Sequence, residues 1–470
     1  MELLLNIMSF IDKADSCTLY SLCLTSTLLR SLCQRMLFST FNSINKQARV
    51  LPFTAAITRN PQLASHVQNI TISLDDGDMA YNRARTRLRS RDLRRVSYLV
   101  PAFRRAIAKI DPPEDLMKEW LEQIKILDAS AFIPLILIQT PNLHRLSVTL
   151  SPDEIITLSP NNDEVHIWSE VGDLQRKREA TYLPTQLKEL EIKYDRDSEI
   201  PSFGQVENLY LPFIKNLDVC HLGSFFCDDP SATIKPGTLN ISDLALQVDR
   251  PGDITVDFIN GCTALRSFKY RLVESNYGYV LPGHLQRLLR PHAHTLEELT
   301  ADFLTKYSGS EVEEYEEEIE ADDRFYASFA DFVRLKRMEV DGCFMHYLQR
   351  ANLPPALEEY TVGTRGNFLR DISKLISSSR DMGFPPLKMN VIAFAQSPGP
   401  IHQRWEEDPD RECAALVERL RGTRISVKLV FTELGNKWPN HLVLADGVGY
   451  RRTSHGDISE DDVGDLLDLL

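Results

Sequence analysis

The chain has no long apolar run, no glycine-rich phosphate loop and no clustered set of metal ligands. None of its apolar runs approaches the roughly 18–20 residues that span a bilayer, so we expect no membrane partner. The glycine patterns typical of dinucleotide sites, P-loops and hydrolase nucleophile elbows are absent as well. No acids form a recognisable catalytic pair. The sequence therefore predicts a protein that is not an enzyme and uses no cofactor.

Cysteines are few, and their spacing favours neither a disulfide framework nor a metal site. They occur at positions 17, 23, 33, 220, 227, 262, 343 and 413, mostly among apolar neighbours. Such residues are typical of reduced thiols, so we expect a cytoplasmic and/or nuclear protein. Cys220, His221 and Cys227 supply only half of a zinc site, and we expect no bound metal. Glu2 precedes the apolar residues 3–11 where a signal peptide carries positive charge, which argues against a signal peptide.

Basic residues are fewer than acidic residues in this chain. The chain has 53 Lys and Arg against 67 Asp and Glu, a formal net charge of −14. This balance argues against a nucleic-acid partner. At 470 residues the chain exceeds what one ordinary hydrophobic core supports, whereas an array of repeats needs no single core.

The first forty residues carry more apolar side chains than a unit of that size can bury. Most residues at positions 3–11 are apolar, and two further apolar stretches begin at Leu19 and Leu28 after a polar break. Surplus apolar surface on a small helical unit is typical of a docking surface. The alternative is that residues 1–40 form the N-terminal helical cap of the larger domain.

The order and spacing of these residues resemble an F-box, the helical module that binds the Skp adaptor of cullin-type ubiquitin ligases. The family opens with Leu-Pro, and Met1 stands where the proline would be, so the first helix lacks the proline that fixes its first turn. The resemblance implies an adaptor-binding surface made of Glu2, Leu3, Leu4, Ile7, Phe10, Ile11, Leu19, Leu22, Leu24 and Leu28.

The rest of the chain carries a degenerate repeat of the form apolar-x-x-apolar-x-apolar. The last three positions alternate as in a strand with one buried face, and the first apolar residue turns in from the preceding loop. Val206 and Ile214 are only eight residues apart, so we expect one of them not to begin a repeat strand. Copies begin at Val67, Leu143, Leu187, Val206, Ile214, Ile241, Leu265, Leu296, Leu335 and Leu357, and a weaker strand follows at Val391–Phe394.

This pattern resembles an irregular leucine-rich repeat that lacks the usual asparagine at nearly every copy. The resemblance implies parallel strands stacked along a solenoid. The predicted fold class is therefore α/β, with a short N-terminal helical F-box-like module at 1–45, an irregular leucine-rich-repeat solenoid at 60–450 and an acidic C-terminal tail at 451–470. The alternative is a set of ordinary strands in a non-repeating α/β fold.

Taken together, the two resemblances predict a substrate-recognition adaptor of a cullin-type (SCF) ubiquitin ligase, similar to F-box proteins of filamentous fungi. The F-box would bind the Skp adaptor and cullin complex, and the solenoid would bind a protein substrate of unknown identity. The alternative is a leucine-rich-repeat interaction scaffold with no ubiquitin-ligase role. Strand positions between the buried ones would face the substrate, and these include Glu189, Glu191, Arg266, Lys269, Glu298, Lys336 and Glu339.

Three charged segments interrupt the repeats or follow them. Residues 83–105 are strongly basic, and they form either a solvated helix face or a dock for an acidic or phosphorylated partner. Residues 311–323 are strongly acidic and predict an exposed loop, with a dock for a basic substrate tail as the alternative. The segment 457–470 is acidic with several leucines, and we expect it to cap the solenoid end, with binding of a partner as the alternative. The helical stripe that overlaps the basic segment consists of Leu93, Val96, Val100, Phe103 and Ile107.

Overall fold

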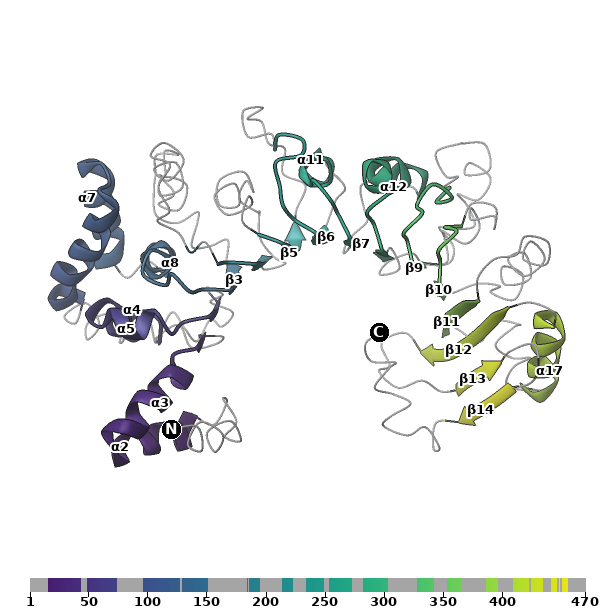
Figure 1. Cartoon of the computed structure of the whole chain (residues 1–470), viewed down its shortest axis with the longest axis horizontal. Helices are drawn as coiled ribbons and strands as arrows, with labels where there is room; N and C mark the ends of the chain where they lie inside the picture. Colours follow the sequence, from purple (N-terminus) through teal and green to yellow (C-terminus); the bar gives the residue numbers. More distant parts are fainter. Residues whose placement is uncertain are drawn as a thin grey trace. The chain divides into compact units, whose positions relative to one another are not determined.

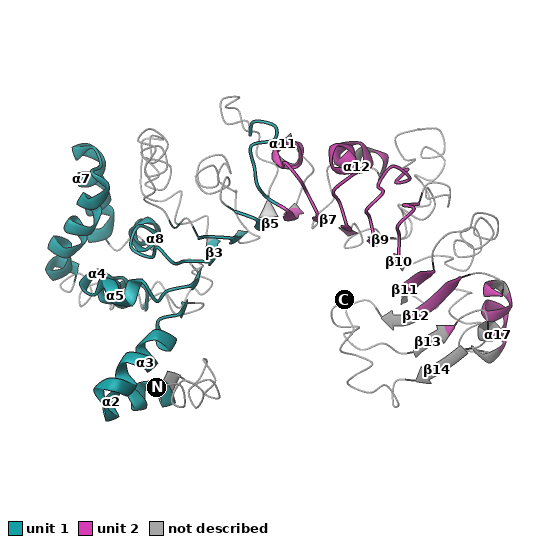
Figure 2. Cartoon of the chain, in the orientation of Figure 1, with its two compact units in different colours: residues 1–241 teal, residues 242–470 magenta. Residues whose placement is uncertain are grey.

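The computed structural model divides the chain into two compact units, Met1–Ile241 and Ser242–Leu470 (Figure 2). Both units combine helices with a parallel sheet, so the predicted α/β class is confirmed. Within the part that the structure describes, no helix is both long and apolar enough to cross a bilayer. The described residues are 16–43, 49–73, 96–126, 129–150, 184, 186–194, 214–222, 234–248, 253–272, 282–302, 328–341, 353–364, 386–395, 409–421, 424–433, 441–445, 448 and 450–454.

In unit 1, the strands pair in chain order and every described pairing is parallel. The strands are β1 (Thr40–Asn42), β2 (Asn69–Ser73), β3 (Arg145–Leu150), β4 (Glu189–Tyr194) and β5 (Asn216–Leu222). The helices are α2 (Ser16–Thr25), α3 (Thr27–Leu37), α4 (Val50–Arg59), α5 (Pro61–Ala64), residues 96–107, η2 (Ala108–Ile110), α7 (Glu114–Lys125) and α8 (Ala129–Leu137) (Figure 1).

In unit 2, the strands also pair in chain order, and the pairings from β6 to β12 are parallel. Figure 1 shows α11 and α12 on one side of β7 and β9. The strands are β6 (Asp243–Val248), β7 (Ser267–Leu272), β8 (Glu298–Asp302), β9 (Arg337–Asp341), β10 (Glu359–Thr364), β11 (Leu387–Ala395), β12 (Ile425–Glu433), β13 (His441–Ala445) and β14 (Tyr450–Ser454). The helices are α11 (Asp253–Gly261), α12 (Pro282–Leu289), η5 (Arg290–His292) and α17 (Pro409–Leu420).

The apolar positions of the repeat form the core of both units. In the copy that enters β3, Leu143 and Leu146 are fully buried and Val148 is 2% exposed. The copy at Ile214 enters β5, whereas the copy at Val206 lies outside the described residues. The first residue does turn in from the loop, because the Leu143 N–H donates to the Thr140 carbonyl at 3.2 Å. The other described copies, each buried at its described apolar positions, begin at Val67, Leu187, Ile241, Leu265, Leu296, Leu335 and Leu357.

One backbone arrangement recurs where these strands begin. The N–H groups of His144 and Arg145 donate to the Gln68 carbonyl at 2.7 and 3.1 Å. Those of Lys188 and Glu189 donate to the His144 carbonyl at 2.8 and 3.0 Å. A carbonyl oxygen has two lone pairs, so one acceptor can serve both donors. The same pair of hydrogen bonds to one carbonyl oxygen occurs at the start of β2, β5, β7, β8, β9 and β10.

The C-terminal strands differ from the predicted all-parallel arrangement. β12 pairs with β13, and β13 with β14, in antiparallel register. The connections between them, residues 434–440 and 446–449, are too short for the crossover that parallel neighbours require. The sequence pattern also missed β1, which has a single apolar residue, Phe41. β14 includes residues 451–454 of the predicted tail, and the rest of that tail lies outside the described residues.

The predicted helix that carries the stripe from Leu93 to Ile107 is confirmed where it is described. Residues 96–107 are helical, and the chain leaves the following 3-10 turn at Asp111, whose φ of 48° is left-handed. Val96, Phe103 and Ile107 are buried as expected, whereas Val100 is only half-buried. Leu93 is outside the described residues.

Candidate functional site

Helices α2 and α3 form a small pair with its own core. Ser26, between them, accepts a hydrogen bond from the Leu29 N–H at 3.1 Å and so caps α3. The core consists of Leu19, Cys23 and Cys33, with Leu22, Met36 and Leu37 packed around it. Burial, followed by the neighbouring Cys23 thiol, raises the pKa of the Cys33 thiol. Both thiols therefore act as apolar packing groups.

The same pair leaves three large apolar side chains in water. Tyr20 is 62% exposed, Leu24 is 65% exposed and Leu28 is 43% exposed. Tyr20 and Leu24 are four residues apart in α2 and therefore share one helix face. Leu28 follows in the first turn of α3. The pair thus combines a filled interior with uncovered apolar surface.

The predicted adaptor-binding residues divide into three groups in the structure. Leu19 is fully buried and Leu22 is partly buried, so both pack within the pair. Leu24 and Leu28 are exposed, and Tyr20, which sequence reasoning did not select, joins them. Its position four residues before Leu24 was the signal that could have identified it. The remaining predicted residues, outside the described part of the chain, are Glu2, Leu3, Leu4, Ile7, Phe10 and Ile11.

In unit 1, charged side chains pair across the exposed face of neighbouring strands. Arg145 on β3 lies opposite Glu189 on β4, and its Nε is 3.7 Å from Glu189 Oε2. The Nη2 atom of Arg145 is 3.5 Å from Glu191 Oε2. Lys193 Nζ approaches Glu191 Oε1 to 2.6 Å. Glu191 is therefore held between two cations.

Glu191 titrates differently from an isolated carboxyl group. Its partial burial would raise its pKa, but hydrogen bonds from Lys193 and Ser147 and the charges of Lys193 and Arg145 together lower it. The side chain is only 17% exposed. Glu191 thus remains ionised as part of a fixed cluster on the strand face.

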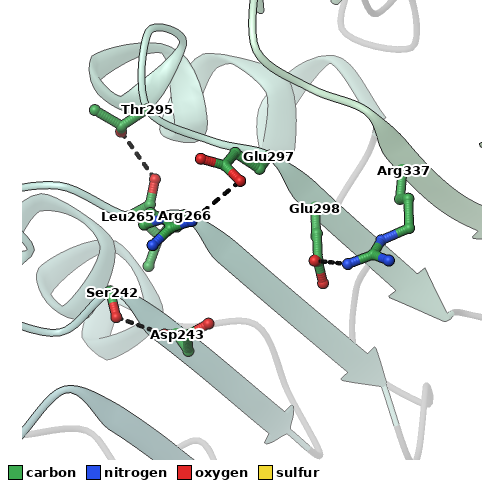
Figure 3. Close-up of polar contacts among 8 residues, drawn as sticks. All are labelled: Ser242, Asp243, Leu265, Arg266, Thr295, Glu297, Glu298 and Arg337. Atoms are coloured by element: carbon green, nitrogen blue, oxygen red, sulfur yellow. Dashed lines mark hydrogen bonds and ion pairs between the residues drawn. The ribbon is translucent and has the colours of Figure 1, made fainter. Parts of the chain in front are cut away.

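In unit 2, two ion pairs among the described residues join adjacent strands on the corresponding face (Figure 3). Arg266, just before β7, donates to Glu297 Oε2 at 3.2 Å. Arg337 on β9 donates to Glu298 on β8. The hydrogen bond from Arg266, followed by its positive charge, lowers the pKa of Glu297, and the same pair raises the pKa of Arg266.

Neutral side chains hold other carboxylates on this face. Thr300 Oγ1 donates to Glu339 Oε2 at 3.4 Å. Asn390 Nδ2 donates to Glu359 Oε1 at 2.8 Å and to Thr361 Oγ1 at 3.2 Å. Asn390 is 7% exposed, so these bonds compensate its burial.

The predicted substrate-facing residues all lie on strands or at the position just before one. Glu189, Arg266, Lys269 and Lys336 are exposed. Sequence reasoning missed the partners Arg145, Glu297 and Arg337, since each lies many residues away along the chain. The half-buried members of the predicted set are Glu191, Glu298 and Glu339.

The remaining charged segments are described only in part. Arg104 and Arg105 are exposed on the helix at 96–107, and the rest of the basic segment is outside the described residues. The acidic residues 311–323 and the segment 457–470 are outside them as well. Cys220 and His221 lie on β5, and Cys227 is not described. Within the described ranges, no three His, Cys, Asp or Glu side chains come together as metal ligands.

Comparison with known proteins identifies no relative of this chain. No model of a protein family, no curated protein and no solved structure matches the chain. The exposed apolar side chains of α2 and α3 and the charged strand faces are therefore the features that bear on function.

Proposed function

We propose that this protein is the substrate-recognition adaptor of a cullin-type ubiquitin ligase. Residues 1–45 would be an F-box-like module that binds the Skp adaptor. The observation that carries the proposal is the exposure of Tyr20, Leu24 and Leu28 on a helix pair whose core is already filled. Such surface is stabilised by a partner that covers it with its own apolar groups.

The proposed substrate-binding part is an irregular leucine-rich-repeat solenoid at residues 60–450. The recurring pair of hydrogen bonds at the strand starts supports this proposal, because the copies that enter β3, β4, β5, β7, β8, β9 and β10 each join the preceding strand in the same way. The buried apolar positions of the motif support it too. A solenoid of this kind presents the outer positions of many strands as one binding face.

The proposed mechanism is proximity, with no bond chemistry by this chain. The helix pair would attach the protein to the ligase, and the strand faces would hold a substrate protein. Holding both in one complex raises the effective concentration of substrate lysines near the charged enzyme.

The test is a pull-down of purified Skp adaptor with the full chain and with the double variant Leu24→Lys, Leu28→Glu. Lysine in the last turn of α2 and glutamate in the first turn of α3 both suit the helix dipoles, so the pair should remain folded. We expect the variant to bind at least about tenfold more weakly, since two apolar contacts are lost.

The matched control is Tyr98→Glu, which changes an 83% exposed aromatic residue on the helix at 96–107. The control should bind the adaptor like the parent chain, and circular dichroism should show the same helix content for all three proteins. Undiminished binding by the double variant, or no binding by the parent chain, contradicts the proposal. The second result would favour a leucine-rich-repeat scaffold without a ubiquitin-ligase role.

A further inference from the structure

The exposed face of unit 2 carries a row of alternating charges. Along this row Glu298 on β8 is registered with Arg337 on β9, Arg337 with Glu359 on β10, and Glu359 with Lys388 on β11. A second alternating row lies one residue earlier, just before the strands, and consists of Arg266, Glu297, Lys336 and Glu358. Opposite charges on adjacent strands stabilise each other across the sheet.

The two signs of charge are not equally accessible on this face. In the pair of Arg266 and Glu297, the side chains are 62% and 27% exposed. In the pair of Arg337 and Glu298, they are 60% and 38% exposed. The guanidinium groups therefore lie outermost and the carboxylates beneath them. Glu358, which is exposed, is the exception.

Three lysines add to this outer basic layer. Lys269, Lys336 and Lys388 are exposed, and none of them belongs to an ion pair with a described residue. Two neighbouring acids are engaged by other groups, because Glu298 binds Arg337 and Glu359 accepts from Asn390, and the exposed Glu358 forms no ion pair with Lys336 among the described contacts. These lysines are therefore available to an outside anion.

We propose that the strand face of unit 2 from β7 to β11 binds an extended anionic segment of a substrate protein. This inference rests on the proposed function, which supplies the substrate protein, and adds the chemistry that the strand face recognises. The anionic groups are carboxylates or phosphates, since lysine and arginine bind both. A protein with a net charge of −14 would recognise an acidic partner through this local basic layer.

The strand spacing sets the periodicity of the ligand. Arg266 and Lys336 are two strands apart, as are Arg337 and Lys388, and two strands span about 9.6 Å. In a chain with the polyproline II conformation, which has three residues per turn and a rise of about 3.1 Å, side chains at every third position share one face about 9.3 Å apart and so match this spacing. Anions at every second position are separated by only about 6.6 Å and do not match.

The experiment measures fluorescence anisotropy of labelled synthetic peptides with the full chain. One peptide has Asp at every third residue with Ser and Ala between, and a second has phosphoserine in place of Asp. A third has the same number of Asp residues at every second position, and a fourth has Asn in place of Asp. We expect the first or second peptide to bind at least about tenfold more tightly than the last two. The tighter of the two identifies carboxylate or phosphate as the source.

The protein variants are Lys336→Glu with Lys388→Glu, and the matched control is Lys118→Glu, an exposed lysine on α7 of unit 1. Glutamate at positions 336 and 388 faces Glu358 and Glu359 on the neighbouring strand, so thermal unfolding and circular dichroism must show that the double variant keeps the parent fold. We expect the double variant to lose at least about tenfold in peptide affinity and the control to lose none.

Equal binding of the four peptides, binding of none, or unchanged affinity in the double variant overturns the proposal. None of these measurements uses the Skp adaptor. Failure of the adaptor pull-down with intact peptide binding would therefore reject the ligase role alone. Intact adaptor binding with no peptide binding would reject this inference alone.

Discussion

His292 Nε2 lies 2.8 Å from the carbonyl oxygen of Ile259, two residues that are 33 positions apart in the chain. The other ring nitrogen, Nδ1, accepts from the Leu265 N–H at 3.5 Å, so Nε2 carries the proton. Thr295 Oγ1 donates to the Leu265 carbonyl at 2.8 Å (Figure 3). These two side chains thus satisfy backbone groups of α11 and of the preceding copy of the motif.

The His292 contacts predict a pH-dependent stability of unit 2. Burial lowers the pKa of His292, and the bond to the Ile259 carbonyl only partly opposes this. The unfolded chain binds the proton on His292 more tightly than the folded chain does. The contribution of His292 to the free energy of unfolding is therefore complete above the ordinary pKa of 6.5 and is lost as the pH falls through the lower pKa of the folded state.

Urea unfolding at pH 7.5 and pH 5.5 checks this expectation against His292→Gln, which does not titrate. The parent chain should lose more stability between the two pH values than the variant does. A parallel decrease in both proteins would assign the pH effect to other groups.

At pH 7.5, His292→Leu should lower the free energy of unfolding by about 2–3 kcal/mol, since it leaves the Ile259 carbonyl and the Leu265 N–H without these partners.

Glu191→Gln should destabilise unit 1 by about 1 kcal/mol, because it removes a carboxylate held by Lys193 and Arg145. The lowered pKa of Glu191 means that its contribution is complete above its ordinary pKa of 4.5 and is lost as the pH falls through the lower folded value. Denaturant unfolding at pH 7 and about pH 3.5 measures both effects. The control, Glu189→Gln, changes a 48% exposed side chain and should cost less. An equal loss in the two variants would contradict the role of the cluster.

The Cys262 thiol should resist alkylation in the folded protein. Burial raises its pKa to about 12 from the ordinary 9.0, and its Sγ donates to the Phe258 carbonyl at 3.1 Å. At pH 8 about a thousandfold less thiolate is then present than in the unfolded chain. Iodoacetamide labelling with mass-spectrometric peptide mapping should show modification of Cys262 only after denaturation. Rapid labelling of the native chain would show that this region opens readily.

Ser43→Ala should stabilise unit 1 by about 1 kcal/mol. Ser43 is fully buried, and its hydroxyl has no hydrogen-bond partner among the described residues, while its backbone N–H donates to the Thr71 carbonyl at 2.9 Å. Removal of an unsatisfied buried hydroxyl relieves its desolvation penalty and leaves the backbone bond intact. Thermal unfolding should show a higher midpoint for the variant. A lower midpoint would indicate a partner for this hydroxyl.

The local period of the sequence was sufficient to locate most strands. Copies such as Leu143-x-x-Leu146-x-Val148 place apolar residues on one face whatever surrounds them, so the strand and its buried side follow from the spacing alone. β1 was missed because Phe41 is its single apolar residue, too few for a period. The antiparallel strands β13 and β14 fall after the last clear motif, and their direction depends on loop lengths instead.

The sequence by itself determined the α/β class, the buried positions of the repeat and the apolar character of the N-terminal helices, because each depends on neighbours within a few residues. Only the tertiary structure decided which charged groups meet. Arg266 and Glu297 are 31 residues apart and Arg337 and Glu298 are 39 apart, so their pairing follows from the register of adjacent strands. The structure likewise separated Leu19, which the helix pair buries, from Leu24, which it exposes, since burial depends on how two helices pack.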